Sequence, residues 1–175
     1  MPFKRVGEII IPLDRYPHLP HWFTLRQALA ELRSAQYEVG EDKIASPRSA
    51  LVFDEAYRLL GQLRHRDIMR GVMPRRLASE ELHLGHVDIS MRPDPELSGL
   101  SFDNTVKSIR EQSERKVSEV MQPIVATLDF DDPLIKAVTE FVEQDLSLIP
   151  VLKDGKVVGV VNTLCVSHEI AQHIL

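Results

Sequence analysis

Five arginines and one carboxylate lie close together in a chain that is acidic as a whole. The arginines are Arg64, Arg66, Arg70, Arg75 and Arg76, and with Asp67 they give a local charge of +4 over thirteen residues. Arginine binds phosphate through paired N–H donors, so Arg64 and Arg66 are candidates for contact with a phosphate-bearing ligand. The alternative is a solvated helix face followed by a basic turn, because a helix cannot direct all five side chains to one side.

The histidines and the single cysteine suggest no catalytic or metal centre. Two faint metal patterns exist, His18 and His21 beside Trp22, and His83 and His86 with Asp88. Neither has the ligand spacing of a zinc site, so we expect surface or loop histidines and no metal. Cys165 excludes an intramolecular disulfide and a cysteine-rich zinc site, and we expect a small buried residue in a reducing compartment.

Known catalytic motifs are also missing. The sequence contains no phosphate-binding Walker loop, no dinucleotide-binding glycine set and no Gly-x-Ser-x-Gly elbow. We therefore expect no enzyme activity and no required cofactor.

The composition is that of a globular protein. The 175 residues are 43% hydrophobic and 27% charged, with a formal net charge of −5. An acidic balance disfavours a whole-surface nucleic-acid binder. The apolar run at 9–11 ends at Pro12 and is too short for a signal segment or a membrane span, so we expect a cytoplasmic protein.

The sequence contains an internal repeat. The two copies match at Val6 and Val117, at Ala28 and Ala137, and at Gly61 and Gly159, with offsets of 111, 109 and 98. The falling offset gives the first copy two extra residues before its helix and eleven more before its glycine. Most of this excess is predicted to be a loop over 37–48, a polar stretch that contains Gly40 and Pro47.

Each copy follows the order strand, helix, strand, strand, helix. In the first copy, Thr24 and Gln27 form a capping box before an apolar stripe of Leu25, Ala28, Leu29 and Leu32. The two strands after this helix are predicted to join around 54–57, and a second helix follows at 66–72. An acid at Asp67, in the first turn of that helix, also favours the helix dipole.

The second copy has clearer signals. Asp132 and Pro133 predict the start of a helix over 133–144, capped by Asp132, whose apolar face is Leu134, Val138, Phe141 and Val142. Strands over 147–152 and 156–161 are joined at Asp154 and Gly155, a pair that suits a tight hairpin. A final helix is predicted over 164–174.

A linker over 74–116 separates the copies, which we assign to 1–73 and 117–175. The prolines at 93 and 95 exclude a continuous helix there. A short helix is predicted over 79–84. A second one, capped by Asp103, is predicted to run to about 114 with Phe102, Val106 and Ile109 on its apolar side.

These residues together resemble the CBS domain, named after cystathionine β-synthase. The resemblance is closest in the second copy, through Val117–Pro123, the Asp-Pro-Leu helix start and the run Ser147–Val161. The first copy matches more loosely. The resemblance implies a mixed α/β (α+β) fold in which two β-α-β-β-α repeats pack with pseudo-twofold symmetry beside an extended, partly helical linker. It implies a stand-alone pair, often called a Bateman module, that forms homodimers and binds adenosine-containing ligands between its motifs.

The family motif is a glycine, two apolar residues, Ser or Thr, two further residues and an Asp that accepts bonds from ribose hydroxyls. In the first copy, Gly61 and Asp67 are kept and Arg64 replaces Ser or Thr. In the second copy, Asn162 and Cys165 replace Ser or Thr and Asp, and a thiol is a weak acceptor. The resemblance therefore implies a ligand site nearer the first copy. Its predicted residues are Asp67, Arg64, Arg66, His65, Leu51, Ile11, Ile149 and Asn162.

Two functions remain open from the sequence. The first is a regulatory module that binds an adenosine-containing ligand such as AMP, ADP, ATP or S-adenosylmethionine and signals to a regulated partner protein. The second is a ligand-independent scaffold for homodimerisation or protein interaction, because neither motif is complete. Both readings exclude a membrane and disfavour nucleic acid as partners.

Overall fold

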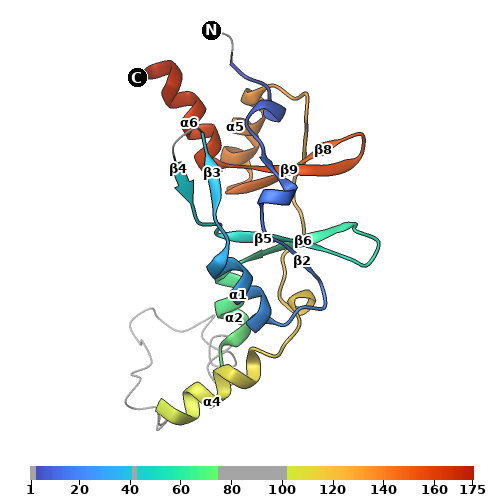
Figure 1. Cartoon of the computed structure of the whole chain (residues 1–175), viewed down its shortest axis with the longest axis vertical. Helices are drawn as coiled ribbons and strands as arrows, with labels where there is room; N and C mark the ends of the chain where they lie inside the picture. Colours follow the sequence, from blue (N-terminus) through green and yellow to red (C-terminus); the bar gives the residue numbers. More distant parts are fainter. Residues whose placement is uncertain (1–2, 41–42, 75–101) are drawn as a thin grey trace, which may run out of the picture.

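The computed structural model describes residues 3–40, 43–74 and 102–175 (Figure 1). The elements of the first half are η1 (Val6–Glu8), β1 (Ile11–Pro12), η2 (Leu13–Arg15), β2 (His18–Pro20), α1 (Leu25–Ser34), β3 (Tyr37–Val39), β4 (Lys43–Ala45), β5 (Ser49–Phe53), β6 (Leu59–Arg64) and α2 (His65–Val72). The second half contains α4 (Phe102–Gln112), η4 (Val117–Glu119), β7 (Leu128–Asp129), α5 (Leu134–Glu143), β8 (Leu148–Lys153), β9 (Lys156–Asn162) and α6 (Thr163–Ile174). The fold is mixed α/β, as predicted.

Each repeat forms its own sheet with two helices beside it. The first sheet has the order β2-β5-β6, and the second has the order β1-β9-β8-β7. In both, a parallel pair (β2 with β5, β7 with β8) is followed by an antiparallel hairpin (β5 with β6, β8 with β9). The helices α1 and α2 lie beside the lower sheet in Figure 1, and α5 and α6 beside the upper one.

The N-terminal segment of each repeat pairs with the sheet of the other repeat. Ile11 in β1 pairs with Val160 in β9, and Gln122 pairs with Gln62 in β6. These two crossing residues, Ile11 and Gln122, are 111 positions apart, which is the offset found between Val6 and Val117. The tandem repeat is thereby confirmed: the second sheet takes the strand β1 from the first half, and the first sheet is joined to the second half by the bridge between Gln62 and Gln122.

The turns and the first helix form as their residues predict. Asp154 and Gly155 have φ angles of 52° and 76°, which suit a tight hairpin between β8 and β9. In α1, the Thr24 hydroxyl accepts from the backbone N–H of Gln27, and the Gln27 side chain accepts from the backbone N–H of Thr24. This predicted capping box is confirmed.

Three details of the helices differ from the sequence prediction. Asp132 does not cap α5: its carboxylate accepts from the Asp129 backbone and from Lys136 Nζ instead. Leu29 and Val142, predicted on buried stripes, are exposed, Val142 at 76%. Both lie at the edge of an apolar stripe, where a small helical rotation decides burial.

The linker prediction is tested only in part, because the helix predicted over 79–84 lies outside the described residues. The second linker helix is present as α4, but it already includes Phe102, so Asp103 lies within its first turn and does not precede it as a cap. None of its side chains is buried, and the Phe102 side chain is 81% exposed. The apolar side of α4 therefore contributes no buried core residue.

The inserted segment over 37–48 is also different from its prediction as a loop. It contains a short antiparallel hairpin in which Tyr37 pairs with Ala45 and Val39 with Lys43. Tyr37 and Val39 are both buried and point into the core of the second repeat. The burial of these two side chains gives the polar segment a regular structure.

Two groups of buried apolar residues hold the molecule together. One lies between α1, α2 and the lower sheet, and includes Leu25, Ala28 and Leu63. The larger one joins the second repeat to β5 and to the inserted hairpin, through residues such as Leu51, Tyr37 and Ile149.

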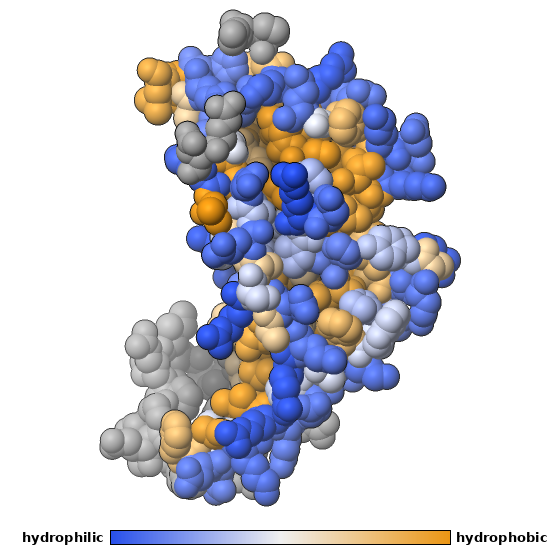
Figure 2. Space-filling model, in the orientation of Figure 1, coloured by the Kyte–Doolittle hydropathy of each residue, from blue (hydrophilic) through white to orange (hydrophobic). Residues whose placement is uncertain are grey.

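Figure 2 shows that surface apolar side chains gather in the upper part of the face shown, around β8 and β9. Within the described residues, no helix is long and apolar enough to cross a membrane.

Candidate ligand-binding clefts

Asp67 is completely buried in the first turn of α2, and its partners come from this chain. Its carboxylate accepts from the Arg64 backbone N–H, from Arg64 Nε and from Arg64 Nη2, each at 2.9 Å. Gln122 Nε2, from the segment of the second half that forms a bridge with Gln62 of β6, donates to it at 3.2 Å. We call these three residues, Arg64, Asp67 and Gln122, the Asp67 cluster.

The Asp67 cluster forms at the N-terminus of α2. Arg64 has extended backbone angles at the N-cap of α2, which brings its side chain back over the third helical residue, Asp67. Burial raises the pKa of Asp67, but the hydrogen bonds and positive charge of Arg64 outweigh it, so the pKa lies below its ordinary value. The carboxylate is therefore ionised at neutral pH and already accepts four hydrogen bonds.

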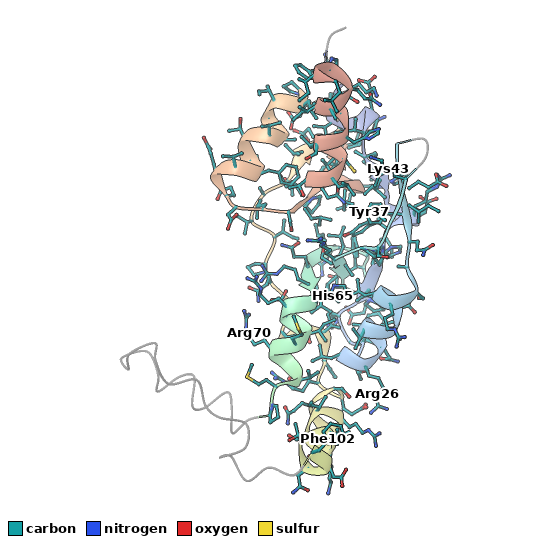
Figure 3. All side chains as sticks on the ribbon, turned by 90° about the vertical axis from the view of Figure 1, so that its left-hand side faces the viewer. Arg26, Tyr37, Lys43, His65, Arg70 and Phe102 are labelled. Atoms are coloured by element: carbon teal, nitrogen blue, oxygen red, sulfur yellow. The ribbon has the colours of Figure 1, made fainter. Side chains whose placement is uncertain are left out.

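The other residues of the arginine group have different surroundings. Arg70 Nη1 lies 3.6 Å from Asp67, and Arg66 is exposed. Figure 3 shows His65 at the upper end of α2, near the other repeat, and Arg70 farther along the helix and pointing outwards. Arg75 and Arg76 lie outside the described residues. Arg64, predicted to meet a phosphate, is bound to Asp67.

A cavity of about 610 Å³ lies against α6, and we call it the α6 cavity. Its walls are the N-terminal segment from Lys4 to Arg15, part of the β3–β4 hairpin, and the side of α6 that carries Cys165 and Glu169. Cys165 is the position that corresponds to Asp67 in the repeat, 98 residues later. The predicted residue Ile11 lines this cavity.

Cys165 forms part of the cavity wall but is a poor ligand group. It is 7% exposed, and burial raises the pKa of its thiol above the ordinary value. Its backbone N–H donates to Asn162 Oδ1 at 2.9 Å, so Asn162 caps α6. The thiol stays protonated at neutral pH and accepts hydrogen bonds weakly.

One helical turn beyond Cys165, the cavity has a buried carboxylate that the motif did not indicate. Glu169 is 3% exposed, and its Oε2 accepts from Lys4 Nζ at 2.8 Å. Its Oε1 lies 3.3 Å from His173 Nε2. Burial raises the pKa of Glu169, but the bond to Lys4 outweighs this, so the pKa lies below its ordinary value. The sequence signal that could have identified Glu169 is an acidic residue on the buried face of a helix.

Tyr37 and Asn162 border a second, smaller cavity of about 430 Å³ at the start of α6. Asn162 Nδ2 donates to Tyr37 Oη at 2.8 Å, and Tyr37 lies beside Tyr16, whose hydroxyl is 3.2 Å from Ser49 Oγ. Burial raises the pKa of both tyrosines. The amide of Asn162 is thus shared between the helix cap and the inserted hairpin.

The predicted site residues do not meet in one place. Asp67 and Arg64 bind each other beside the lower sheet, Ile11 lines the α6 cavity, and Asn162 lines the smaller cavity. Leu51 and Ile149 are fully buried on β5 and β8, in the large apolar core.

The histidine pairs form no metal site that the structure describes. His21 pairs with Glu55, and His18 packs edge-on against Phe53. The second pair, His83 and His86, lies outside the described residues. Over 3–40, 43–74 and 102–175, no group of three or more His, Cys, Asp or Glu side chains is placed to hold a metal ion.

Comparison with known proteins agrees with this architecture. A family model described as the CBS domain matches residues 117–164. The fold is similar to CBSX2 of Arabidopsis thaliana, with 16% identity, a TM-score of 0.63 and coverage of 99% of this chain and 98% of that one. Residues 117–164 therefore match a CBS domain, and the chain as a whole has the fold of a CBS-pair protein.

Other solved structures share this fold. One is the CBS domain of a membrane protein from Sphaerobacter thermophilus, with 21% identity, a TM-score of 0.60 and coverage of 94% of this chain and 86% of that one. Another is CBSX2 in complex with AMP, with 17% identity, a TM-score of 0.60 and coverage of 98% of both chains. No curated protein matches the chain. The family model covers the second CBS motif, in line with the looser motif of the first.

Proposed function

We propose that this CBS pair is a regulatory module that binds an adenosine-containing ligand in a cleft between its motifs and signals to a partner protein. The observation that carries the proposal is the α6 cavity. Its volume of about 610 Å³ falls within the range of about 300–1,000 Å³ that is usual for small-molecule sites. The related fold of CBSX2 has been solved with AMP, which supports the ligand class.

The chemistry of the cavity wall suits such a ligand. Ile9, Ile10 and Ile11, which lead from η1 into β1, offer an apolar surface for a planar base, while Glu169 and Lys43 add polar groups of both signs. The wall is therefore mixed: apolar residues lie beside charged side chains of both signs, and convergent polar groups of this kind can fix the orientation of a small molecule. Figure 3 shows Lys43 on the hairpin beside α6.

Asp67 remains the alternative contact for the ribose within the same function. A ligand at that position would compete with Gln122, whose amide donates to Asp67 at 3.2 Å. It would also share the carboxylate with Arg64. The variants Asp67→Asn and Glu169→Gln distinguish a ligand at Asp67 from a ligand in the α6 cavity, because each variant removes the charge of one carboxylate.

A thermal-shift panel tests ligand binding whether the ligand lies in the α6 cavity or at Asp67. The panel contains AMP, ADP, ATP, S-adenosylmethionine, NADH and cyclic dinucleotides. A ligand at 100 times its dissociation constant adds about 2.7 kcal/mol to the free energy of unfolding, a rise of roughly 5–11 °C in Tm for a chain of this length. Absence of any shift at millimolar concentration would rule out the sensor.

A scaffold is the second candidate function, favoured by the internal contacts of Asp67 and by exposed apolar residues on α5. Ile135 and Val142 are 68% and 76% exposed on that helix. We propose that a homodimer covers them. Light scattering of protein stripped of nucleotide separates the two functions, because a scaffold keeps its assembly and its partner binding without ligand.

A further inference from the structure

Resting on the proposed function, we infer that Glu169 has replaced residue 165 as the carboxylate that binds the sugar hydroxyls of a nucleotide in the α6 cavity. The acid of this cleft is therefore displaced by one helical turn, and it has not been lost. The ligand class is a ribose nucleotide with a phosphate, of which AMP is the simplest example.

The helix geometry places the two positions together. Residues 165 and 169 are four apart on α6, so their side chains lie one above the other on the same face. Both line the α6 cavity. The side chain of cysteine is smaller than that of aspartate, and this leaves space in the wall next to Glu169.

The carboxylate has acceptor capacity left for a ligand. An ionised carboxylate offers about four lone-pair positions. Lys4 Nζ occupies one of them at 2.8 Å, and His173 Nε2 lies near the other oxygen at 3.3 Å. Glu169 lines the cavity, so a ligand there can approach the acceptor positions that Lys4 and His173 do not use. Because the side chain is buried, this contact would form away from bulk water. Ribose hydroxyls are donors that suit such an acceptor.

Cations at the cavity rim complement a phosphate. Lys43 lies on β4 at the rim, and Arg15 lies on η2. Arg15 Nη1 is 3.6 Å from Glu38 Oε2, and both side chains are well exposed, so this pair is weak and can be exchanged for a ligand phosphate. The cavity thus offers an acceptor for hydroxyls and donors for an anion.

The test combines two variants with two ligands. AMP and 2′,3′-dideoxy-AMP, which lacks both sugar hydroxyls, are titrated by calorimetry into the wild type, Glu169→Gln and the control Glu143→Gln. Glu143 is an exposed residue on α5, so its variant has the same charge change away from the cavity. We expect Glu169→Gln to weaken AMP binding by about ten- to a hundredfold. Dideoxy-AMP binding should be equally weak in the wild type and Glu169→Gln, and Glu143→Gln should match the wild type.

Several results would overturn the inference. Equal affinity of the wild type for AMP and dideoxy-AMP would exclude a hydroxyl contact, and this comparison needs no variant to fold. Full AMP binding by Glu169→Gln together with lost binding by Asp67→Asn would move the ligand to the Asp67 cluster, with the proposed function intact. No binding of any panel ligand by the wild type would instead refute the function itself.

Discussion

Replacing Asp67 with asparagine removes a charge while keeping the shape of the side chain. The lost interactions are mainly the two charge-assisted hydrogen bonds from Arg64 Nε and Nη2, both at 2.9 Å. Such bonds contribute about 1.5–3 kcal/mol each, and breaking a fully buried ion pair costs about 3–5 kcal/mol. The Arg64 side chain is 37% exposed and can be hydrated again. We therefore expect the free energy of unfolding to fall by about 2–3 kcal/mol.

Urea unfolding and calorimetry at neutral pH measure this effect. At about 2–4 °C per kcal/mol for a chain of this length, the Tm should fall by roughly 4–12 °C. Asp131→Asn is the matched control, because its exposed side chain undergoes the same change of charge. If Asp67→Asn unfolds within about 0.5 kcal/mol of the wild type, the Asp67 cluster does not stabilise the fold and the reasoning fails.

The pH dependence follows from the direction of the pKa shift. The folded pKa of Asp67 lies below its ordinary value, so its contribution to stability is complete above the unfolded pKa of about 3.9. It is lost as the pH falls from there through the lowered folded pKa. The difference between the wild type and Asp67→Asn should therefore stay constant from neutral pH to about pH 5 and shrink only in stronger acid. A difference that already disappears at pH 6 would contradict this assignment.

Three further changes test other parts of the structure. A Cβ at Gly159 would clash with the backbone oxygen of Ile11 in β1, so Gly159→Ala should destabilise the protein more than Gly155→Ala. Gly155 faces open space at a φ of 76°, and its replacement should cost about 1 kcal/mol. Denaturant curves compare the two variants, and the reverse order would contradict the pairing of β1 with β9. Tyr37→Phe removes the partner of Asn162 and should lower the free energy of unfolding by about 1 kcal/mol in the same assay, whereas an unchanged value would show that the bond adds nothing. The buried Cys165 thiol, with its raised pKa, should react with a disulfide reagent far more slowly in native than in urea-unfolded protein, and equal rates would refute its burial.

The repeat made most of the fold predictable from the sequence. The offset of 111 between Val6 and Val117 recurs between Ile11 and Gln122, the two residues that pair with the sheet of the other repeat, and the second helices lie where their patterns predicted. The capping box and the Asp-Gly turn depend on residues within four positions of each other. Signals of this kind are local, so the sequence contains them in full.

The parts that could not be predicted depend on partners far away in the chain. Tyr37 is buried because it meets Asn162, 125 positions later, and this contact orders a segment that is polar and irregular by itself. Glu169 is stabilised by Lys4, 165 positions earlier. The motif directed attention to Asp67, yet the buried carboxylate that lines the α6 cavity, Glu169, is one turn beyond the motif. No periodicity or spacing in the sequence indicates these pairings.

Calorimetric titration of AMP into the wild-type protein, first freed of bound nucleotide, tests the central claim most directly. We predict saturable binding with one high-affinity site per chain, which 2′,3′-dideoxy-AMP reproduces only weakly. Binding that is absent for AMP and for every other adenosine compound of the panel at millimolar concentration would contradict the claim and leave the scaffold as the function of this protein.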